Sequence, residues 1–145
     1  MSKVTFNNRN NVFYETLNSA VKTYFSEKNL KTTGNINLYL KALALIPAPI
    51  FLYIFLVFYT PAAWIALPLC GLLGFVLASI GFNVMHDGGH GSFSESKTMN
   101  KIASYASSMM GASQFMWNMK HNMIHHTYTN IDGVDDDIEI GALMR

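Results

Sequence analysis

All five histidines of this 145-residue chain lie in two short groups. The first group is His86 and His90, and the second is His121, His125 and His126. Residues four apart lie on one face of a helix, so each group can direct two imidazoles at one metal ion. The next residue along a helix is rotated by about 100°, so the second group can also reach a neighbouring ion. Imidazole suits iron, zinc, copper and nickel, and the pattern therefore predicts a transition-metal site.

The residues within the first group affect its expected geometry. Asp87 points away from the helical face of His86, so we expect it to orient an imidazole N–H rather than to bind the metal itself. Gly88, Gly89 and Gly91 are poor helix formers. They predict that the helix ends or loosens here, and that the first histidine pair has a less strict geometry.

A run of carboxylates at residues 132–139 follows the second group. Such a run invites a calcium interpretation, but it lacks the EF-hand pattern, in which Asp or Asn alternate and a Glu occupies the twelfth place. We therefore expect this run to form a solvated surface, or a structural contact with another part of a longer protein.

The elements that carry the histidines follow from the distribution of charge. No Asp, Glu, Lys or Arg occurs between Lys41 and Asp87. This stretch is too long for one membrane crossing of about 20 residues, but it fits two. The sequence Tyr-Thr-Pro at residues 59–61 interrupts the apolar run. We therefore predict a hairpin of two helices, at residues 42–59 and 62–85, joined by a tight turn.

These features predict an all-α integral membrane protein in three parts. Residues 42–85 form the transmembrane hairpin. Residues 1–41 form a polar region without the features of a signal peptide. It contains an amphipathic helix around residues 13–24, which lies on the membrane surface or packs on its own protein. Residues 86–145 carry both histidine groups on the cytoplasmic face.

The segment between the histidine groups allows two interpretations. Residues 102–119 carry no charge, and a third membrane span there would separate the two groups by roughly 30 Å. Ile102, Tyr105, Met109 and Met116 recur at helical spacing, which favours an interfacial or partly embedded helix. The second interpretation keeps all the histidines on one side of the membrane, where they can share a site.

Composition excludes several classes of function. Ten Lys and Arg against nine Asp and Glu give a formal charge of +1, so no nucleic-acid partner is expected. The single cysteine, Cys70, excludes an intrachain disulfide and a CxxC motif. Lysines lie on both sides of the predicted hairpin, whereas its turn has none. Both the N-terminus and the histidine groups are therefore expected in the cytoplasm.

Two motifs and the residues after them resemble a known family. The sequences HDGGHGSFS at residues 86–94 and HNMIHHTYTN at residues 121–130 resemble the first two histidine boxes of membrane fatty acid desaturases. Residues 131–138 resemble the segment after the second box in the branch with linoleoyl-CoA-type and front-end acyl desaturases. The similarity extends over nearly the whole chain, and two boxes together are far more specific than one HxxxH motif.

The resemblance implies a particular chemistry. It implies two non-haem iron ions, bound by His86, His90, His121, His125 and His126, which activate O₂ to remove two hydrogens from an acyl chain. The substrate would be an acyl-CoA or an acyl-lipid within the membrane lipid, in a bacterial inner membrane. Electrons must come from outside, because the chain has no cysteine motif for haem or an iron–sulfur cluster. A ferredoxin or a b-type cytochrome is the implied donor.

The chain differs from the desaturase family in one respect, and its histidine groups also suit other functions. The family has a third histidine box after a second pair of membrane helices, and this chain has neither. We therefore expect it to be the N-terminal part of a longer enzyme, inactive alone. The same boxes would also suit a di-iron hydroxylase or ketolase. A non-catalytic membrane hairpin that binds zinc or copper is a further alternative.

Overall fold

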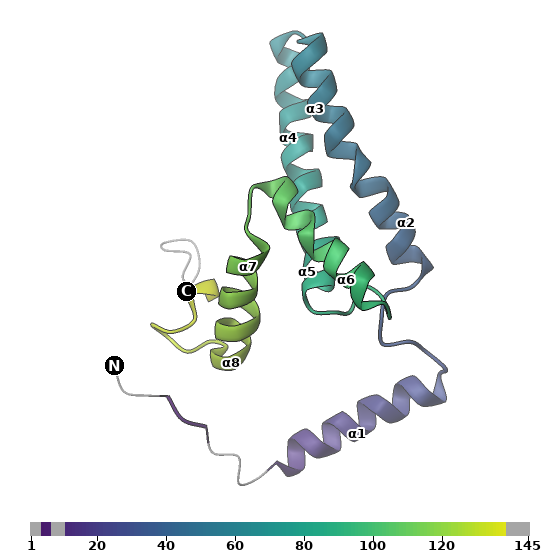
Figure 1. The fold of residues 1–145 in the computed structure, drawn as a ribbon, viewed down its shortest axis with the longest axis vertical. Helices are drawn as coiled ribbons and strands as arrows, with labels where there is room; N and C mark the ends of the chain where they lie inside the picture. The colour runs from purple at the N-terminus through teal and green to yellow at the C-terminus, as the bar shows by residue number, and fades with distance from the viewer. Residues whose placement is uncertain (1–3, 7–10, 139–145) are drawn as a thin grey trace. The chain divides into compact units, whose positions relative to one another are not determined.

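The computed structural model describes residues 4–6 and 11–138, and the regular elements within them are all helical (Figure 1). The chain divides into two compact units, Met1–Thr32 and Thr33–Arg145. The first unit contains α1, Val12–Glu27, which confirms the predicted helix near the N-terminus. Its apolar side chains, among them Phe13 and Leu17, are exposed. Contact of this face with a membrane surface stays a prediction.

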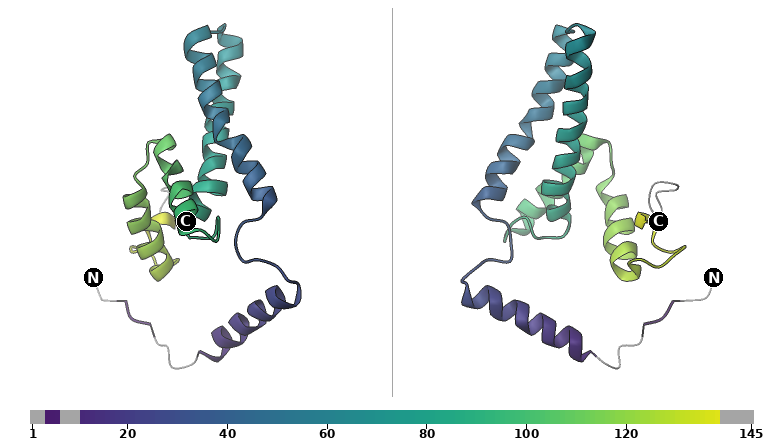
Figure 2. Two further views of the ribbon diagram at one scale, coloured as in Figure 1. Left: turned by 45° about the vertical axis from the view of Figure 1, so that its right-hand side comes forward. Right: turned by 180° about the vertical axis from the view of Figure 1, so that it is seen from behind.

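The second unit contains two long apolar helical rods that run side by side (Figure 2). The first rod, Ile36–Tyr59, consists of α2, Ile36–Leu45, and α3, Pro47–Tyr59. It begins earlier than predicted, because the side chain of Asn35 accepts a hydrogen bond from the Leu38 N–H at 3.2 Å and so caps a helix that continues through Lys41.

The second rod, Ala63–Gly89, carries the first histidine group in its last turns. It consists of α4, Ala63–Ile80, the π-helical segment η1, Gly81–Met85, and α5, His86–Gly89. The hairpin is confirmed as two helices long and apolar enough to cross a membrane. The predicted end at residue 85 is wrong, because the helix continues through the first histidine.

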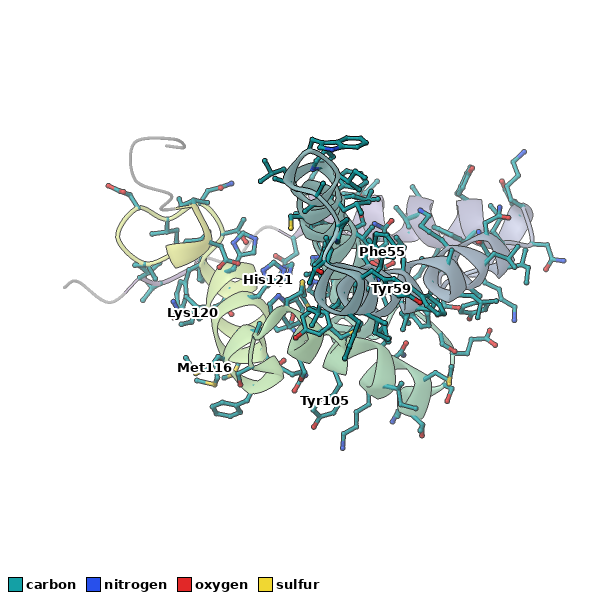
Figure 3. All side chains as sticks on the ribbon, turned by 90° about the horizontal axis from the view of Figure 1, so that it is seen from above. Phe55, Tyr59, Tyr105, Met116, Lys120 and His121 are labelled. Atoms are coloured by element: carbon teal, nitrogen blue, oxygen red, sulfur yellow. The ribbon has the colours of Figure 1, made fainter. Side chains whose placement is uncertain are left out.

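The surface of the hairpin is strongly apolar. Phe51, Phe58, Trp64 and Phe75 are between 69% and 76% exposed, an amount of open apolar surface that suits a lipid environment. The rings of Phe55 and Tyr59 stack on one another, with centroids 5.3 Å apart (Figure 3).

The hydrophobic core lies where α2 and the end of the second rod pack against the segment that follows α5. The helix α6, Lys97–Ser104, packs on α5 so closely that a Cβ on Gly88 would lie 2.5 Å from the Ser104 nitrogen. Ile80 and Val84 are fully buried in this core. A glycine is therefore needed at residue 88 for the close approach of two helices, and it does not loosen the helix there.

Hydrogen bonds from polar side chains stabilise the chain before and after His86 and His90. The Lys41 Nζ donates to Asn83 Oδ1 at 3.0 Å, and Asn83 Nδ2 donates to the Ser79 carbonyl at 2.8 Å, which links α2 to η1. Beyond the pair, Asn100 Nδ2 donates to the carbonyls of Gly91 and Ser94, at 2.9 and 2.8 Å. The loop that leaves the first histidine group is thus held by a buried amide.

The uncharged segment at residues 102–119 is not one helix. After α6 the chain forms the 3₁₀ segment η2, Tyr105–Met110, and it turns at Gly111, whose φ is +73°. A new helical rod then begins after Ser113, whose side chain accepts from the Met116 N–H at 3.4 Å. The third-span interpretation is therefore wrong, because the helix ends at Gly111. The expected interfacial or partly embedded helix is divided in two at the same point, and its position at the membrane interface stays a prediction.

Candidate metal centre

The second histidine group lies on the rod that follows this turn. The rod consists of α7, Gln114–Trp117, the π-helical segment η3, Asn118–His125, and α8, His126–Tyr128. It runs beside α5 (Figure 1) and is joined to it by Asn122, whose Nδ2 donates to the Gly89 carbonyl at 3.1 Å. The turn at Gly111 thus brings together two histidine groups that are far apart in the sequence.

The first pair keeps a regular helical geometry. His90 is the C-cap of α5, and its N–H donates to the His86 carbonyl at 3.0 Å. The two Nε2 atoms therefore face each other at 3.2 Å. The helix ends at this group as predicted, because Gly91 takes a φ of +73°. The expected loosening of the pair itself is not observed.

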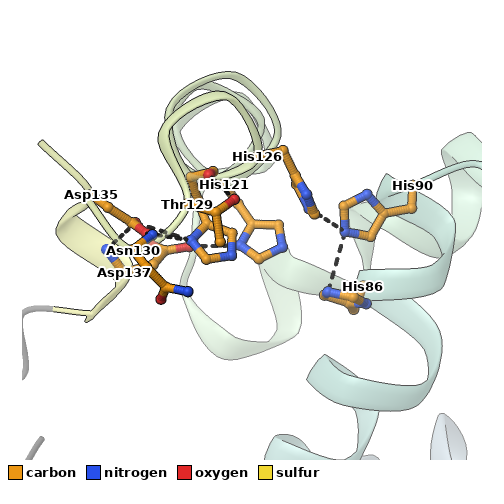
Figure 4. A network of polar contacts seen from close by, with 9 residues as sticks. His86, His90, His121, His126, Thr129, Asn130, Asp135 and Asp137 are labelled. Atoms are coloured by element: carbon orange, nitrogen blue, oxygen red, sulfur yellow. Dashed lines mark hydrogen bonds and ion pairs between the residues drawn. The ribbon is translucent and has the colours of Figure 1, made fainter. Parts of the chain in front are cut away.

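The π-helical turn brings the second group together. The N–H of His126 bonds to the His121 carbonyl, five residues earlier, which widens the turn. As a result the rings of His125 and His126 both lie beside His121, with centroids 5.0 and 4.9 Å away. They point in different directions, as the rotation along the helix predicts. His126 faces the first pair, with its Nε2 3.3 Å from the Nε2 of His90 (Figure 4).

Carboxylates hold the other side of the second group. Asp137 Oδ2 lies 2.6 Å from Nδ1 of His121, and both oxygens of Asp135 lie 3.0 Å from Nδ1 of His125 (Figure 4). Asp135 is only 1% exposed. The expectation of a solvated surface is wrong for Asp135, because the loop after α8 folds back onto the histidines, whereas Asp137 stays exposed while it pairs with His121. Glu139, at the end of the acidic run, lies outside the described residues.

Asp87 does not have the role expected from its position. Its Oδ1 lies 3.8 Å from Nδ1 of His86, which is too far for a hydrogen bond. The carboxylates that orient imidazoles are instead Asp135 and Asp137, which sequence reasoning missed. One signal could have found them, since a metal-binding histidine nearly always donates its second ring N–H to a carboxylate, a carbonyl or water.

These carboxylates leave the opposite ring nitrogens available to a metal. A neutral imidazole that donates from Nδ1 has a lone pair on Nε2. In His121 this Nε2 is buried and has no hydrogen-bond partner among the described residues. A buried, unpartnered nitrogen beside other imidazoles fits a metal ligand, because such an atom is otherwise costly.

The donor atoms are close enough to share a metal ion. One nitrogen each from His86, His90 and His121 lie within 4.8 Å of one another. A second group of donors within the same limit is formed by His121, His125 and Asp137. His121 belongs to both groups and links them. The residues present therefore fit one metal position, and they supply part of the donors that a neighbouring position would need.

The electrostatics favour neutral imidazoles and an ionised carboxylate. Burial, and then the neighbouring His86, His126 and His121, lower the pKa of His90 to about 4. Burial and the same cluster lower the pKa of His126 as well. Both rings therefore keep a lone pair at neutral pH.

Asp135 is held as a carboxylate although it is buried. Burial by itself raises its pKa, but hydrogen bonds from the Asn130 N–H, the His125 ring and the Asp137 N–H outweigh this and lower the pKa below the ordinary value. The site thus combines neutral donors with fixed negative charge behind them, which raises the basicity of a metal-binding imidazole.

An apolar hollow adjoins the histidines. Its volume is about 310 Å³, and it lies between η1, η2 and α7. His86 and His121 contribute to its wall, and the other lining residues are Ala78, Gly81, Phe82, Met85, Met110 and Trp117. The site therefore offers imidazole nitrogens that could hold a metal ion, beside a space that suits a hydrocarbon group.

Comparisons with known proteins give a consistent result. The sequence profile of the family described as Fatty acid desaturase matches residues 62–144. The sn-1 linoleoyl-lipid 6-desaturases of Arthrospira platensis and Synechocystis sp. are each 35% identical, over 99% and 92% of this chain. An acyl-lipid (8-3)-desaturase of Physcomitrium patens is 29% identical over 90% of the chain.

The relatives are considerably longer than this chain. The match covers 39% of the Arthrospira protein, 37% of the Synechocystis protein and 27% of the Physcomitrium protein. No solved structure matches the chain.

Proposed function

Because this chain belongs to the fatty acid desaturase family, we propose that it forms the histidine-bearing part of a membrane enzyme that inserts a double bond into an acyl chain. The observation that carries the proposal is the convergence of His86 and His90 with His121 at one centre, with a buried Nε2 that lacks a hydrogen-bond partner in the described structure. Such a donor set suits a transition metal, and the adjacent hollow suits a hydrocarbon substrate.

Iron is the metal we propose, as two non-haem ions. The five histidines His86, His90, His121, His125 and His126 would hold them. When bound, iron can supply the oxidising power, drawn from O₂, that removal of hydrogen from an unactivated methylene requires and that redox-inert zinc lacks. Asp137 and Asp135 keep the rings of His121 and His125 oriented. A second ion needs more donors than five imidazoles provide, and we propose that they come from outside residues 1–145.

The proposed substrate is an acyl group on a membrane lipid. The names of the relatives, which act on acyl-lipids, support this choice over an acyl-CoA. The apolar hollow beside His86 and His121 would receive the part of the chain that reacts. The two rods Ile36–Tyr59 and Ala63–Gly89 would cross the membrane. The lysines around them favour a cytoplasmic position for both the N-terminus and the histidines.

The remaining partners follow from what the chain lacks in its sequence. Residues 1–145 have one cysteine and no CxxCH motif, and we propose that electrons reach the centre from a carrier such as a ferredoxin or a b-type cytochrome. The bacterial relatives support an inner membrane as the location.

Analysis of products tests the proposal. The complete gene that encodes this chain is expressed in a bacterial host supplied with linoleic acid, and the fatty acids of its membrane lipids are identified by gas chromatography and mass spectrometry. We expect a new acyl chain that has lost two hydrogens, and no such product from the same gene with His86→Ala. An acyl chain that gains oxygen instead would assign the centre to a hydroxylase, and no product with normal expression would contradict an acyl substrate.

A further inference from the structure

Trp117 lies between the two histidine groups and contacts both. Its ring stacks on His121, with centroids 4.8 Å apart and an interplanar angle of 23°. It meets His86 and His90 edge to face, with centroids 6.0 and 5.5 Å away. The same ring forms part of the wall of the apolar hollow. One indole therefore touches three of the proposed metal ligands, which come from two separate helical rods.

The ring of Trp117 needs a glycine on the opposite rod. A Cβ on Gly89 would lie 2.1 Å from Cζ3 of Trp117 and 2.5 Å from its Cη2, so any other residue would displace the ring. The backbone does not explain this glycine, because Gly89 lies within α5 and glycine is a poor helix former. The contact with the indole does explain it.

The ring cannot move freely to accept a larger neighbour. It is stacked on His121, and His121 is held on its other side by Asp137 at 2.6 Å. A displaced indole would therefore push His121 away from the first histidine pair. The Gly89 carbonyl is also the acceptor for Asn122, so the same residue joins the two rods by a hydrogen bond and by ring packing.

We propose that Trp117 and Gly89 form a spacer that fixes the separation of the two histidine groups, with Trp117 as a positioning residue for the metal centre. The indole sets how closely the rods approach, and Gly89 provides the surface on which the ring rests. This inference rests on the proposed metal centre, which the test examines separately.

Cobalt binding provides the test, because Co²⁺ gives visible absorption bands that depend on its ligands and requires no turnover. The purified protein in detergent is titrated with Co²⁺, as wild type, as Gly89→Ala and as Gly71→Ala. Gly71 is a matched control in the same rod, since nothing lies within 4 Å of an added Cβ there. We expect Gly89→Ala to weaken binding at least about tenfold and to shift the bands, and Gly71→Ala to bind like wild type.

A second substitution separates a positioning role from a general loss of folding. Trp117→Leu removes the ring and should also weaken cobalt binding. In the double variant, Gly89→Ala should add little to the effect of Trp117→Leu, because the clash is gone. The spacer role would be contradicted if the losses of cobalt affinity caused by Gly89→Ala and by Trp117→Leu added fully in the double variant. Normal cobalt binding by Gly89→Ala would contradict it as well. Absence of cobalt binding by the wild-type protein would instead contradict the metal centre itself.

Tryptophan fluorescence provides a second test of whether Trp117 lies beside the bound metal. The chain has two tryptophans, Trp64 and Trp117. In a Trp64→Phe variant, emission comes from Trp117 alone, and Co²⁺ bound beside His121 should quench it strongly. Unquenched emission at saturating Co²⁺ in this variant would place Trp117 away from the metal and contradict its role.

Discussion

Replacing His121 with alanine is expected to abolish metal binding almost completely. His121 is the histidine that belongs to both groups of donor atoms, one with His86 and His90 and the other with His125 and Asp137. Its loss leaves each group with one donor fewer and removes the connection between them. It also removes the ring on which Trp117 stacks. The iron content of the purified protein after anaerobic loading with Fe²⁺ measures this effect.

The control for this variant is Lys97→Ala. Lys97 begins α6, and its exposed side chain is not among the donors identified in the described structure. It should bind iron and, in the complete protein, desaturate like the wild type. Both variants should insert into membranes normally, since neither residue lies in Ile36–Tyr59 or Ala63–Gly89. If His121→Ala retained full iron content or activity, His121 would have to be removed from the set of ligands.

Replacing Asp135 with asparagine is expected to lower metal affinity by about tenfold to a hundredfold. The substitution keeps the size of the side chain and one acceptor oxygen, but it removes the charge and turns the other oxygen into an NH₂ donor. The hydrogen bond from His125 Nδ1 should therefore weaken, and the His125 ring should be less firmly held in its orientation and tautomer. Asp135 also accepts from the Asn130 N–H at 2.8 Å, so the loop after α8 should loosen as well.

Cobalt titration measures the affinity, and Asp87→Asn provides the matched control. The Asp87 carboxylate lies 3.8 Å from the nearest His86 nitrogen, so its neutralisation should change the affinity only slightly. Equal effects of the two substitutions would show that general charge in the site matters and that the hydrogen bond to His125 does not. A normal affinity in Asp135→Asn would contradict the orienting role directly.

The hairpin and the histidine groups could be predicted because their signals are local. A stretch without charges between Lys41 and Asp87 and a Tyr-Thr-Pro break predict two apolar helices and a turn. The i, i+4 spacing predicts which imidazoles share a face, and His86 and His90 do so. At the two helix ends the prediction differs from the structure, since Asn35 caps the first rod early and the second rod continues past Met85 through α5.

The features that could not be predicted depend on contacts between distant residues. The acidic run looks solvated in isolation, and only the return of the loop after α8 brings Asp135 and Asp137 to the imidazoles. The apolar residues from Ile102 to Met116 fit one helical stripe, but the turn at Gly111 divides them. Helical spacing records which residues share a face and contains no information about where a neighbouring rod will lie.

Gly89 illustrates the same limit. Its low helix propensity is visible in the sequence and predicts a weakened helix. In the structure the helix remains intact through Gly89, and the glycine accommodates the ring of Trp117 from the opposite rod. The sequence identifies the unusual residue, whereas its physical reason requires the positions of both rods.

X-ray absorption at the iron K-edge of the iron-loaded protein tests the histidine centre most directly, because it reports the atoms bound to the metal without requiring activity. We expect a first shell dominated by imidazole nitrogens, with the multiple-scattering pattern of histidine, that is lost in His121→Ala. A shell containing sulfur, which would have to involve Cys70 or a methionine, or one made of oxygen alone, would contradict the assignment of the five histidines as the ligands.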